Sequence, residues 1–332
     1  MKRKVGPAGI GLRFVLAAML LMVFASSTLF SQSFDFPSKK WGISFGNSKE
    51  FTGLRFNFRD SRVKRITGIN VTLWPPKKDN EEARVNGLSL GVAAGGGYMH
   101  GVHLGVLGVG AEKNLAGFSV GLIGVGSGEN VTGLNIGGLG VGAGENLKGL
   151  NIGGLGVGAG EDLIGINIGG LGVGAGENLI GINIGVLGAG AGENMTGLNI
   201  GGLGVGAGEN LIGINIGGLG AGAGEKSVGL TIGGLGVGAE EVQGITIGGL
   251  GVGGEVLKGI QLALGTVIVP RGGRMIGFSA SAFNYIRGTQ TGVTIGIVNY
   301  CWRLKGVQIG LVNIVRDNPK YSKVLPLINV NF

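Results

Sequence analysis

The chain is poor in the residues that carry most enzyme and metal chemistry. It contains one cysteine, Cys301, and two histidines, His100 and His103. One thiol cannot form an internal disulfide, so Cys301 is expected to be a small core or lipid-facing residue. The histidines could form a weak metal pair with a carboxylate such as Glu112, but no third ligand follows at a recognisable spacing. With no triad motif either, we expect no catalytic, cofactor-binding or metal site, no cofactor, and a chain that is not an enzyme.

Charged residues are also scarce, at 14% of the chain. A folded soluble surface normally carries more, so we expect something other than water to cover part of the protein. There are only seven prolines, and glycine does not recur at every third residue, which excludes collagen. Leucine, isoleucine and valine recur throughout, and the mean hydropathy of +0.41 argues against disorder. What remains is a folded chain with 77 glycines in 332 residues.

The N-terminus predicts export. Four basic residues among the first thirteen precede an apolar run at 14–24, and small residues follow at 25–27. This order is typical of a secretory signal peptide, which we place at 1–31 with cleavage between Ser27 and Gln32. The apolar run is shorter than the roughly 20 residues of a membrane-spanning helix, and an uncleaved anchor is the alternative. We expect an outer-membrane or cell-surface location.

The charge is unevenly distributed. The net charge of +8 comes from the leader and from basic stretches at 39–84 and 271–323, whereas the middle is mildly acidic. Nucleic acid is a poor partner for an exported chain. The basic stretches could meet acidic polysaccharide or lipid phosphate, on charge alone. We expect outer-membrane lipid as a partner and assign no protein or polysaccharide partner.

Glycine recurs with a fixed period, which must be recognised before a fold is named. Nine glycines open units of sixteen residues: Gly101, Gly117, Gly133, Gly149, Gly165, Gly181, Gly197, Gly213 and Gly229. Less regular units of 14 to 19 residues extend the pattern on both sides. We therefore expect divergent β-repeats at 32–100, regular glycine-rich repeats at 101–260, and divergent β-repeats at 261–332 that end in a barrel-type terminal strand.

Apolar residues alternate within each unit, which indicates strands and not a helix. In the unit 133–148 the alternating residues are Leu134 and Ile136, then Leu139, Val141 and Ala143. A bulge or bend at Gly137–Gly138 is expected to return all five to one face, with Asn135 and glycines on the other. A turn at 144–146 follows. One unit is then one strand plus one turn, or two short strands around a bend.

The C-terminal part resembles a known family. The segment 292–315, GVTIGIVNYCWRLKGVQIGLVNIV, is followed by Asp-Asn-Pro at 317–319 and by a closing INVNF. This looks like the bacterial surface-repeat proteins built from Gly-Leu-x-Ile-Gly-Leu-Val-Asn units. The resemblance covers most of the chain after about residue 41 and departs in the middle, where Gly-Gly-Leu-Gly-Val-Gly replaces Gly-Leu-Val-Asn. It implies export and a surface location, and it transfers no functional residue.

The last strand carries a second resemblance. Its residues Ile328, Val330 and Phe332 share one face, as in the terminal strand by which bacterial outer-membrane barrels are inserted. An antiparallel meander closed into an outer-membrane-type β-barrel is therefore one arrangement of the units. The other is a parallel β-solenoid, in which each unit is one coil.

Two repeated side chains argue in opposite directions. In a parallel stack, glutamates at equivalent turn positions would lie about 4.8 Å apart, and each contact would cost about 1 kcal/mol even in water. These are Glu129, Glu145, Glu161, Glu177, Glu193 and Glu209. Asparagines in register could instead form a hydrogen-bonded ladder in a solenoid: Asn135, Asn151, Asn167, Asn183, Asn199 and Asn215. We favour the barrel.

Two further motifs would indicate ligand binding only if other structural features accompanied them. The Gly-x-Gly-x-x-Ala pattern, as in 138–143, resembles a phosphate-binding turn, but no helix follows it. The Glu–Asn turns could bind calcium in a parallel stack, yet only Asp162 supplies the aspartate that calcium-binding coil repeats carry. We therefore expect a non-enzymatic structural or interaction protein of the outer membrane or cell surface, with a passive pore as one form. The alternative is a secreted β-solenoid adhesin that binds a ligand along a flat repeat face.

Overall fold

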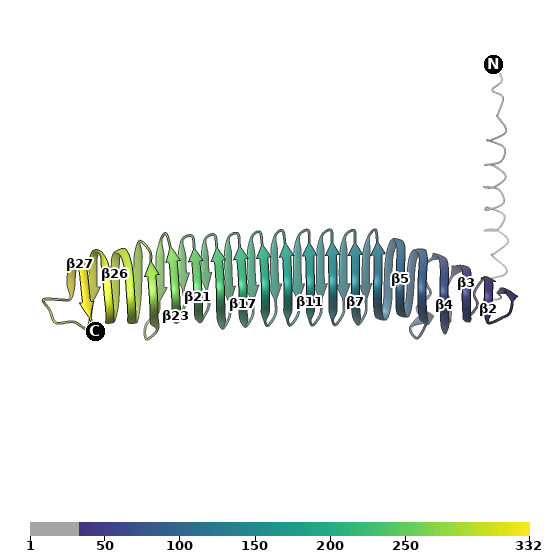
Figure 1. Cartoon of the computed structure of the whole chain (residues 1–332), viewed down its shortest axis with the longest axis horizontal. Coiled ribbons are helices and arrows are strands. Elements are labelled where there is room, and N and C mark those ends of the chain that lie inside the picture. Colours follow the sequence, from purple (N-terminus) through teal and green to yellow (C-terminus); the bar gives the residue numbers. More distant parts are fainter. Residues whose placement is uncertain (1–32) are drawn as a thin grey trace, which may run out of the picture.

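The computed structural model describes residues 33–332, which form one straight rod of stacked β-coils (Figure 1). The expected signal peptide at 1–31 lies outside the described residues. Each regular coil consists of a longer strand, a corner, a shorter strand and a turn, as in β7 (Asn130–Gly137) and β8 (Gly140–Ala143). Equivalent strands of successive coils pair in parallel and in register, with Gly133 opposite Gly149. The architecture is an all-β parallel solenoid.

Two stacks of parallel strands run along the rod. The long-strand sheet contains β2 (Trp41–Phe45), β3 (Glu50–Arg59), β4 (Arg65–Trp74), β7, β9 (Leu147–Gly153), β11 (Leu163–Gly169), β13 (Leu179–Gly185), β15 (Met195–Gly201), β17 (Asn210–Gly217), β19 (Lys226–Gly233), β21 (Glu241–Gly248), β23 (Val256–Ala263) and β25 (Arg274–Ala280). The short-strand sheet contains β6 (Gly124–Ser127), β8, β10 (Gly156–Ala159), β12 (Gly172–Ala175), β14 (Gly188–Ala191), β16 (Gly204–Ala207), β18 (Gly220–Ala223), β20 (Gly236–Gly238), β22 (Gly251–Gly253) and β24 (Thr266–Val269). Two continuous strands, β5 (Arg84–Gly121) and β26 (Phe283–Val315), pass through both sheets. A 3-10 helix, η1 (Lys78–Asn80), is the one helical element among the described residues.

The expected antiparallel barrel is wrong. The strands from β2 to β26 pair in parallel from coil to coil, and antiparallel pairing within residues 33–332 occurs only at the two ends. There, β1 (Phe34–Pro37) pairs with β2, and β27 (Val324–Asn331) pairs with β26. Both end strands cap the rod by covering the edge of a parallel sheet. Ile328 and Val330 do share an exposed face, but they belong to this cap and not to a barrel-type terminal strand.

The interior between the two sheets combines Asn135 and Val141, which were expected on opposite faces. Asn135 is 0% and Val141 is 3% exposed, whereas Leu139 is 50% exposed at the corner. Leu134 and Ile136 alternate with Asn135 and therefore point outward from the long-strand sheet. The expectation that all five apolar residues share one face is wrong, because the bend at 138–139 is a corner between two sheets and leaves Leu134 and Ile136 on the outer surface. Two short strands around a bend describe the unit.

Asparagine can occupy the interior because each side chain has a partner in a neighbouring coil. Asn151 Nδ2 donates to Asn167 Oδ1 at 2.9 Å. The other bonds of this ladder, from Asn135 to Asn215, measure 2.8–2.9 Å. A buried amide without such a partner would cost about 1–3 kcal/mol. Stacking in register therefore makes a polar residue suitable for the interior, next to the fully buried column that includes Leu147 and Leu163.

The glycine that opens each coil is fixed by close contact between backbones. Gly149 has a φ of +124°, and a Cβ atom there would lie 2.0 Å from the carbonyl oxygen of Gly133. Residues with a side chain rarely adopt this conformation, and the contact leaves no room for one. The period of glycine is thus a steric requirement of stacking. We call these residues the column glycines.

Candidate functional site

The two histidines lie on opposite sides of β5. His100 is exposed, whereas His103 is fully buried in the interior column that asparagine occupies in later coils. Burial is the main cause that lowers the pKa of His103 to about 4, and the nearby His100 adds to the effect. The imidazole of His103 is therefore neutral at pH 7. Glu112 is exposed, and residues 33–332 contain no group of three or more His, Cys, Asp or Glu side chains that could hold a metal ion.

The other residues considered for chemistry have structural positions. Cys301 is buried, and burial raises the pKa of its thiol to about 12, so this thiol packs in the core and is not a nucleophile. The Gly-x-Gly-x-x-Ala pattern at 138–143 forms the corner and β8, with a turn and a further strand after it. Neither position provides the environment that phosphate binding or covalent chemistry requires.

One edge of the rod, where the turns lie, carries a column of glutamates. The antiparallel barrel would have separated these charges, and that arrangement is wrong. The coils stack in parallel, and Glu145 N donates to the carbonyl oxygen of Glu129 at 2.9 Å. Asn146 Nδ2 donates to Glu161 Oε2 at 3.3 Å, so amides are interleaved with the carboxylates. Desolvation and then the neighbouring carboxylates raise the pKa of Glu177. The column is an acidic edge on which amides alternate with carboxylates.

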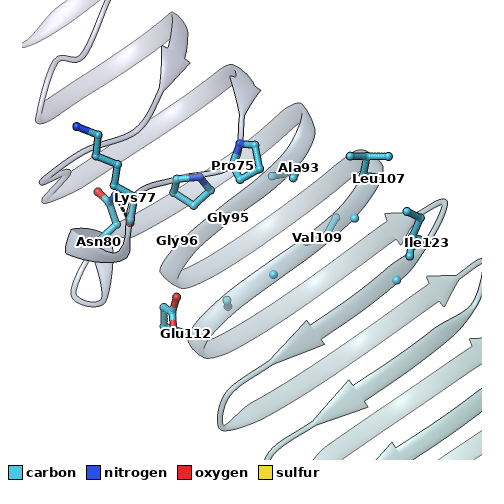
Figure 2. Close-up of a pocket in the computed structure, with 16 residues that line it drawn as sticks. Pro75, Lys77, Asn80, Ala93, Gly95, Gly96, Leu107, Val109, Glu112 and Ile123 are labelled. Carbon is cyan, nitrogen blue, oxygen red and sulfur yellow. Dashed lines mark hydrogen bonds between the residues drawn. The ribbon is translucent and has the colours of Figure 1, made fainter. Parts of the chain in front are cut away.

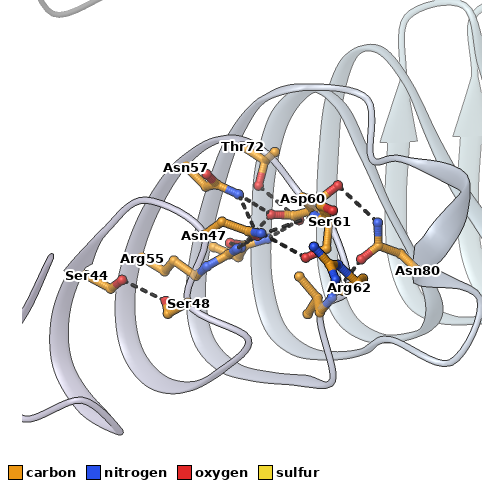
Figure 3. Close-up of polar contacts among 12 residues, drawn as sticks. Ser44, Asn47, Ser48, Arg55, Asn57, Asp60, Ser61, Arg62, Thr72 and Asn80 are labelled. Carbon is orange, nitrogen blue, oxygen red and sulfur yellow. Dashed lines mark hydrogen bonds and ion pairs between the residues drawn. The ribbon is translucent and has the colours of Figure 1, made fainter. Parts of the chain in front are cut away.

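A buried ion pair lies in the N-terminal coils (Figure 3). Arg55 is 0% exposed, and its Nη1 lies 2.6 Å from Asp60 Oδ1 and 2.8 Å from Asn70 Oδ1. Asn57 Nδ2 donates to the same Asp60 oxygen at 2.6 Å, and Asn80 Nδ2 donates to the Asp60 carbonyl oxygen at 3.0 Å. Each charged group has hydrogen-bond partners besides the other, although the buried Arg55 Nε has none. Because both charged side chains are inaccessible, this cluster holds the 60–80 segment against the coils and has a structural role.

An open cleft of about 560 Å³ lies beside η1 (Figure 2). Pro75 and Lys77 form one wall, and glycines of the short-strand side, such as Gly95, form the floor. Pro76 packs directly on this floor, since its Cγ would lie 2.8 Å from a Cβ at Gly95. Among the lining residues, Lys77 and Glu112 carry the titratable side chains. The cleft therefore offers neither a nucleophile with a base nor a paired acid and base.

The outer surface of the long-strand sheet is apolar over many coils. In the long-strand sheet, each odd-numbered strand from β7 to β23 presents two leucine or isoleucine side chains, at the first and third positions after its column glycine. We call this surface the aliphatic face. Its residues are Leu134, Ile136, Leu150, Ile152, Ile166, Ile168, Ile182, Ile184, Leu198, Ile200, Ile214, Ile216, Leu230, Ile232, Ile245, Ile247, Ile260 and Leu262. Ile182 is 38% and Ile214 is 44% exposed. An exposed apolar patch of this extent marks an interaction surface.

The remaining surfaces of the regular coils are different. The short-strand sheet presents glycines outward, and a Cβ at Gly158 would lie 3.7 Å from the carbonyl oxygen of Gly174. This side is nearly bare backbone. The corner carries a ridge of leucines, represented by Leu155 at 49% exposure, and the opposite edge is acidic. Only the aliphatic face is at once broad, apolar and free of charge, and it is the candidate functional site. The sequence pattern did not identify it, because Leu134 and Ile136 were expected to share one face with Leu139, Val141 and Ala143.

Comparison with models of protein families, with curated proteins and with solved structures finds no match for this chain. The resemblance to bacterial surface-repeat proteins therefore stays a prediction from the residues that carry it. Across residues 33–332, no helix is long and apolar enough to cross a membrane. A proposal for its function therefore rests on the geometry of the rod.

Proposed function

We propose that this chain is a non-enzymatic, exported β-solenoid of the cell surface, and that it serves as an adhesive structural element by binding a second copy of itself through the aliphatic face. Two uninterrupted rows of leucine and isoleucine on a flat sheet support this proposal most strongly. Export rests on the predicted signal peptide. The passive pore depended on a barrel and has lost its structural basis.

The aliphatic face is large enough for a stable interface. Nine strands, from β7 to β23, contribute to it. With a strand spacing of about 4.8 Å and a rise of about 3.3 Å per residue, nine strands of at least seven residues cover roughly 1,000 Å² of sheet. A standard protein–protein interface covers about 800 Å² on each partner. Face-to-face pairing of two copies therefore reaches the size of an ordinary specific complex.

A second copy suits this face better than a lipid surface does. The rod is straight (Figure 1), and two sheets can pack face to face about 10 Å apart. The two rows contain no aromatic residue, and the positions before the column glycines of these strands add only the charges of Lys148 and Lys258. Helices that lie on a membrane surface combine aromatic anchors with a polar face rich in lysine and arginine. A flat aliphatic surface matches an identical surface instead.

Charge introduced into the face tests the proposal. In the variant Ile166→Lys with Ile214→Lys, pairing would bury lysines without partners, so we expect dimers to dissociate at least tenfold more readily, because an uncompensated buried charge is costly. Sedimentation equilibrium of the mature protein measures this association. The matched control is Gly158→Lys with Gly206→Lys on the short-strand side, where Cβ atoms would have ordinary contacts at 3.7 and 3.9 Å.

We expect the control variant to associate as the unsubstituted protein does. An unsubstituted protein that stays monomeric at high concentration would contradict the proposal, as would equal losses in both variants. A third outcome is that the unsubstituted protein floats with phosphatidylcholine vesicles and only the Ile166→Lys, Ile214→Lys variant fails to do so. The partner of the aliphatic face would then be a membrane and not a second copy, which would also contradict the proposal. Export is checked separately, by sequencing the N-terminus of the protein recovered from the cell surface.

A further inference from the structure

The acidic edge of the rod changes its charge near the C-terminal end. Glutamates occupy the turns up to Glu255, whereas the next two coils place Arg271 and Arg287 at this edge. Backbone bonds fix their order: Arg274 N donates to the carbonyl oxygen of Glu255 at 2.8 Å, and Gly272 N donates to that of Arg287 at 3.2 Å. Cations therefore follow directly upon the acidic column, on successive coils.

These cations line a cleft of about 270 Å³, which we call the arginine cleft. Its walls are formed by Arg271, Arg287, Thr289, Trp302 and Arg303, and glycines border it where the turns have no side chain. All three arginines are exposed, and Trp302 is 37% exposed. The cleft thus combines guanidinium groups, a hydroxyl group and an accessible indole ring.

The indole ring also orients arginine side chains. The guanidinium carbon of Arg271 lies 5.8 Å from the centroid of the Trp302 ring, and that of Arg316 lies 5.0 Å from it. Guanidinium groups at such distances are attracted to the ring. Two flexible side chains are thereby held beside the cleft before any ligand arrives, which reduces the entropy lost on binding.

The positive charges have little compensation. Residues 261–332 contain eight lysines and arginines but one acidic residue, Asp317. Asp317 Oδ2 lies 3.3 Å from Arg303 Nε. In the part of the chain that the structure describes, no carboxylate lies within ion-pair distance of Arg271, Arg287 or Arg316. An anionic ligand would relieve the repulsion among these groups.

We propose that the arginine cleft binds a carboxylate-bearing polysaccharide whose chain runs along the rod axis. A guanidinium group is planar and can hold a carboxylate with two parallel hydrogen bonds. Successive coils are about 4.8 Å apart, which is comparable with the length of one sugar residue in an extended glycan. Consecutive uronate carboxylates would therefore meet arginines on consecutive coils, and the apolar face of a sugar ring would pack on Trp302.

A chain polymer suits this cleft better than a membrane does. The arginines surround a recess in the edge of the rod, and a single polymer chain can enter it while a flat layer of lipid headgroups meets only its rim. The proposal does not depend on the aliphatic face, which lies on the sheet surface and not on this edge. Failure of self-association would leave it unaffected.

Binding to immobilised polygalacturonate tests the proposal, with the mature protein at moderate salt. We expect the variant Arg271→Gln, Arg287→Gln, Arg303→Gln to bind at least tenfold more weakly than the unsubstituted protein. The matched control Lys39→Gln, Lys40→Gln, Lys64→Gln removes the same charge from the other end of the rod and should keep its affinity. A third variant with lysine at the three arginine positions keeps the charge but not the paired hydrogen bonds, and we expect an intermediate loss.

Circular dichroism and thermal unfolding verify that each variant is folded. If the triple variant fails to fold, the double variant Arg271→Gln, Arg287→Gln takes its place, since both side chains are exposed, Arg271 in a turn and Arg287 within β26. Three results would overturn the proposal: no binding of the unsubstituted protein to polygalacturonate, equal losses in the arginine and lysine variants, or binding to phosphatidylglycerol vesicles without binding to polygalacturonate. Neutral dextran serves as the uncharged probe and should not bind.

Discussion

At the scale of single residues, backbone contacts determine which substitutions the rod tolerates. Two of the kinds of glycine in each coil differ in how closely they meet the neighbouring coil. The column glycines have positive φ values and touch the coil before them, whereas outward glycines of the short strands such as Gly158 and Gly190 have ordinary φ values and room for a Cβ atom. Composition alone cannot separate the two kinds, because both appear simply as glycine in a glycine-rich chain.

A matched pair of alanine substitutions separates them. At Gly181, with a φ of +117°, a Cβ would lie 2.1 Å from the carbonyl oxygen of Gly165, so we expect Gly181→Ala to destabilise its coil by roughly 2–4 kcal/mol. At Gly190 the nearest atom would be 3.6 Å away, and Gly190→Ala should change stability by less than about 0.5 kcal/mol. Hydrogen exchange of the amides in β11 to β15 measures both effects. Similar protection factors in the two variants would contradict this steric explanation.

A single buried imidazole makes stability depend on pH. In the unfolded chain His103 titrates near 6.5, whereas in the folded chain its pKa is about 4. The contribution of the neutral imidazole to the free energy of unfolding is therefore complete above pH 6.5. It is lost as the pH falls from there through about 4, and the total loss is about 3 kcal/mol. We expect His103→Asn, which places an uncharged amide at this interior position, to remove this part of the acid sensitivity. Urea unfolding at pH 7.5 and pH 4 measures it, and an unchanged difference between the two pH values would exclude His103 as its source.

At the scale of the strand, the sequence predicts the elements better than their arrangement. Alternation at Leu134 and Ile136 indicates a strand, and the structure has one there. The grouping of its side chains was wrong, because Leu134 and Ile136 were expected on one face with Val141, whereas Asn135 shares the interior with Val141. In a parallel stack, Asn135 gains a partner in Asn151, and the alternation then directs its neighbours outward. The spacing of sixteen between asparagines was the signal that could have revealed both the stacking and the aliphatic face.

Electrostatics misled the prediction of strand direction for a physical reason. The repulsion between turn glutamates is small because water screens them, at about 1 kcal/mol for each pair. Each coil gains an amide ladder bond in the interior and a full set of backbone bonds, such as Glu161 N to the Glu145 carbonyl oxygen at 2.9 Å. The basic stretch 271–323 indicated a positively charged region, but it could not indicate the arginine cleft. The approach of Arg316 to Trp302 depends on how the coils stack.

At the scale of the whole molecule, the solenoid predicts tolerance to changes in length. Deletion of 165–180 removes one complete coil and joins Ile164 to Gly181 in the correct register. Because each coil contacts only its neighbours, we expect the shortened protein to fold with a nearly unchanged midpoint of urea unfolding. Deletion of 165–172 is the control, since half a coil would bring long and short strands into the same stack. Equal damage by both deletions, measured by circular dichroism during unfolding, would argue against independent coils.

The distance between the two ends of the rod follows from the number of coils. The N-terminal cap and the arginine cleft lie at opposite ends, and each coil between them adds about 4.8 Å (Figure 1). Gain or loss of a repeat in the gene would therefore change the reach of the protein while leaving the chemistry of either tip intact. The number of coils sets the length of the rod, and recombination between near-identical units can change that length in steps of one coil.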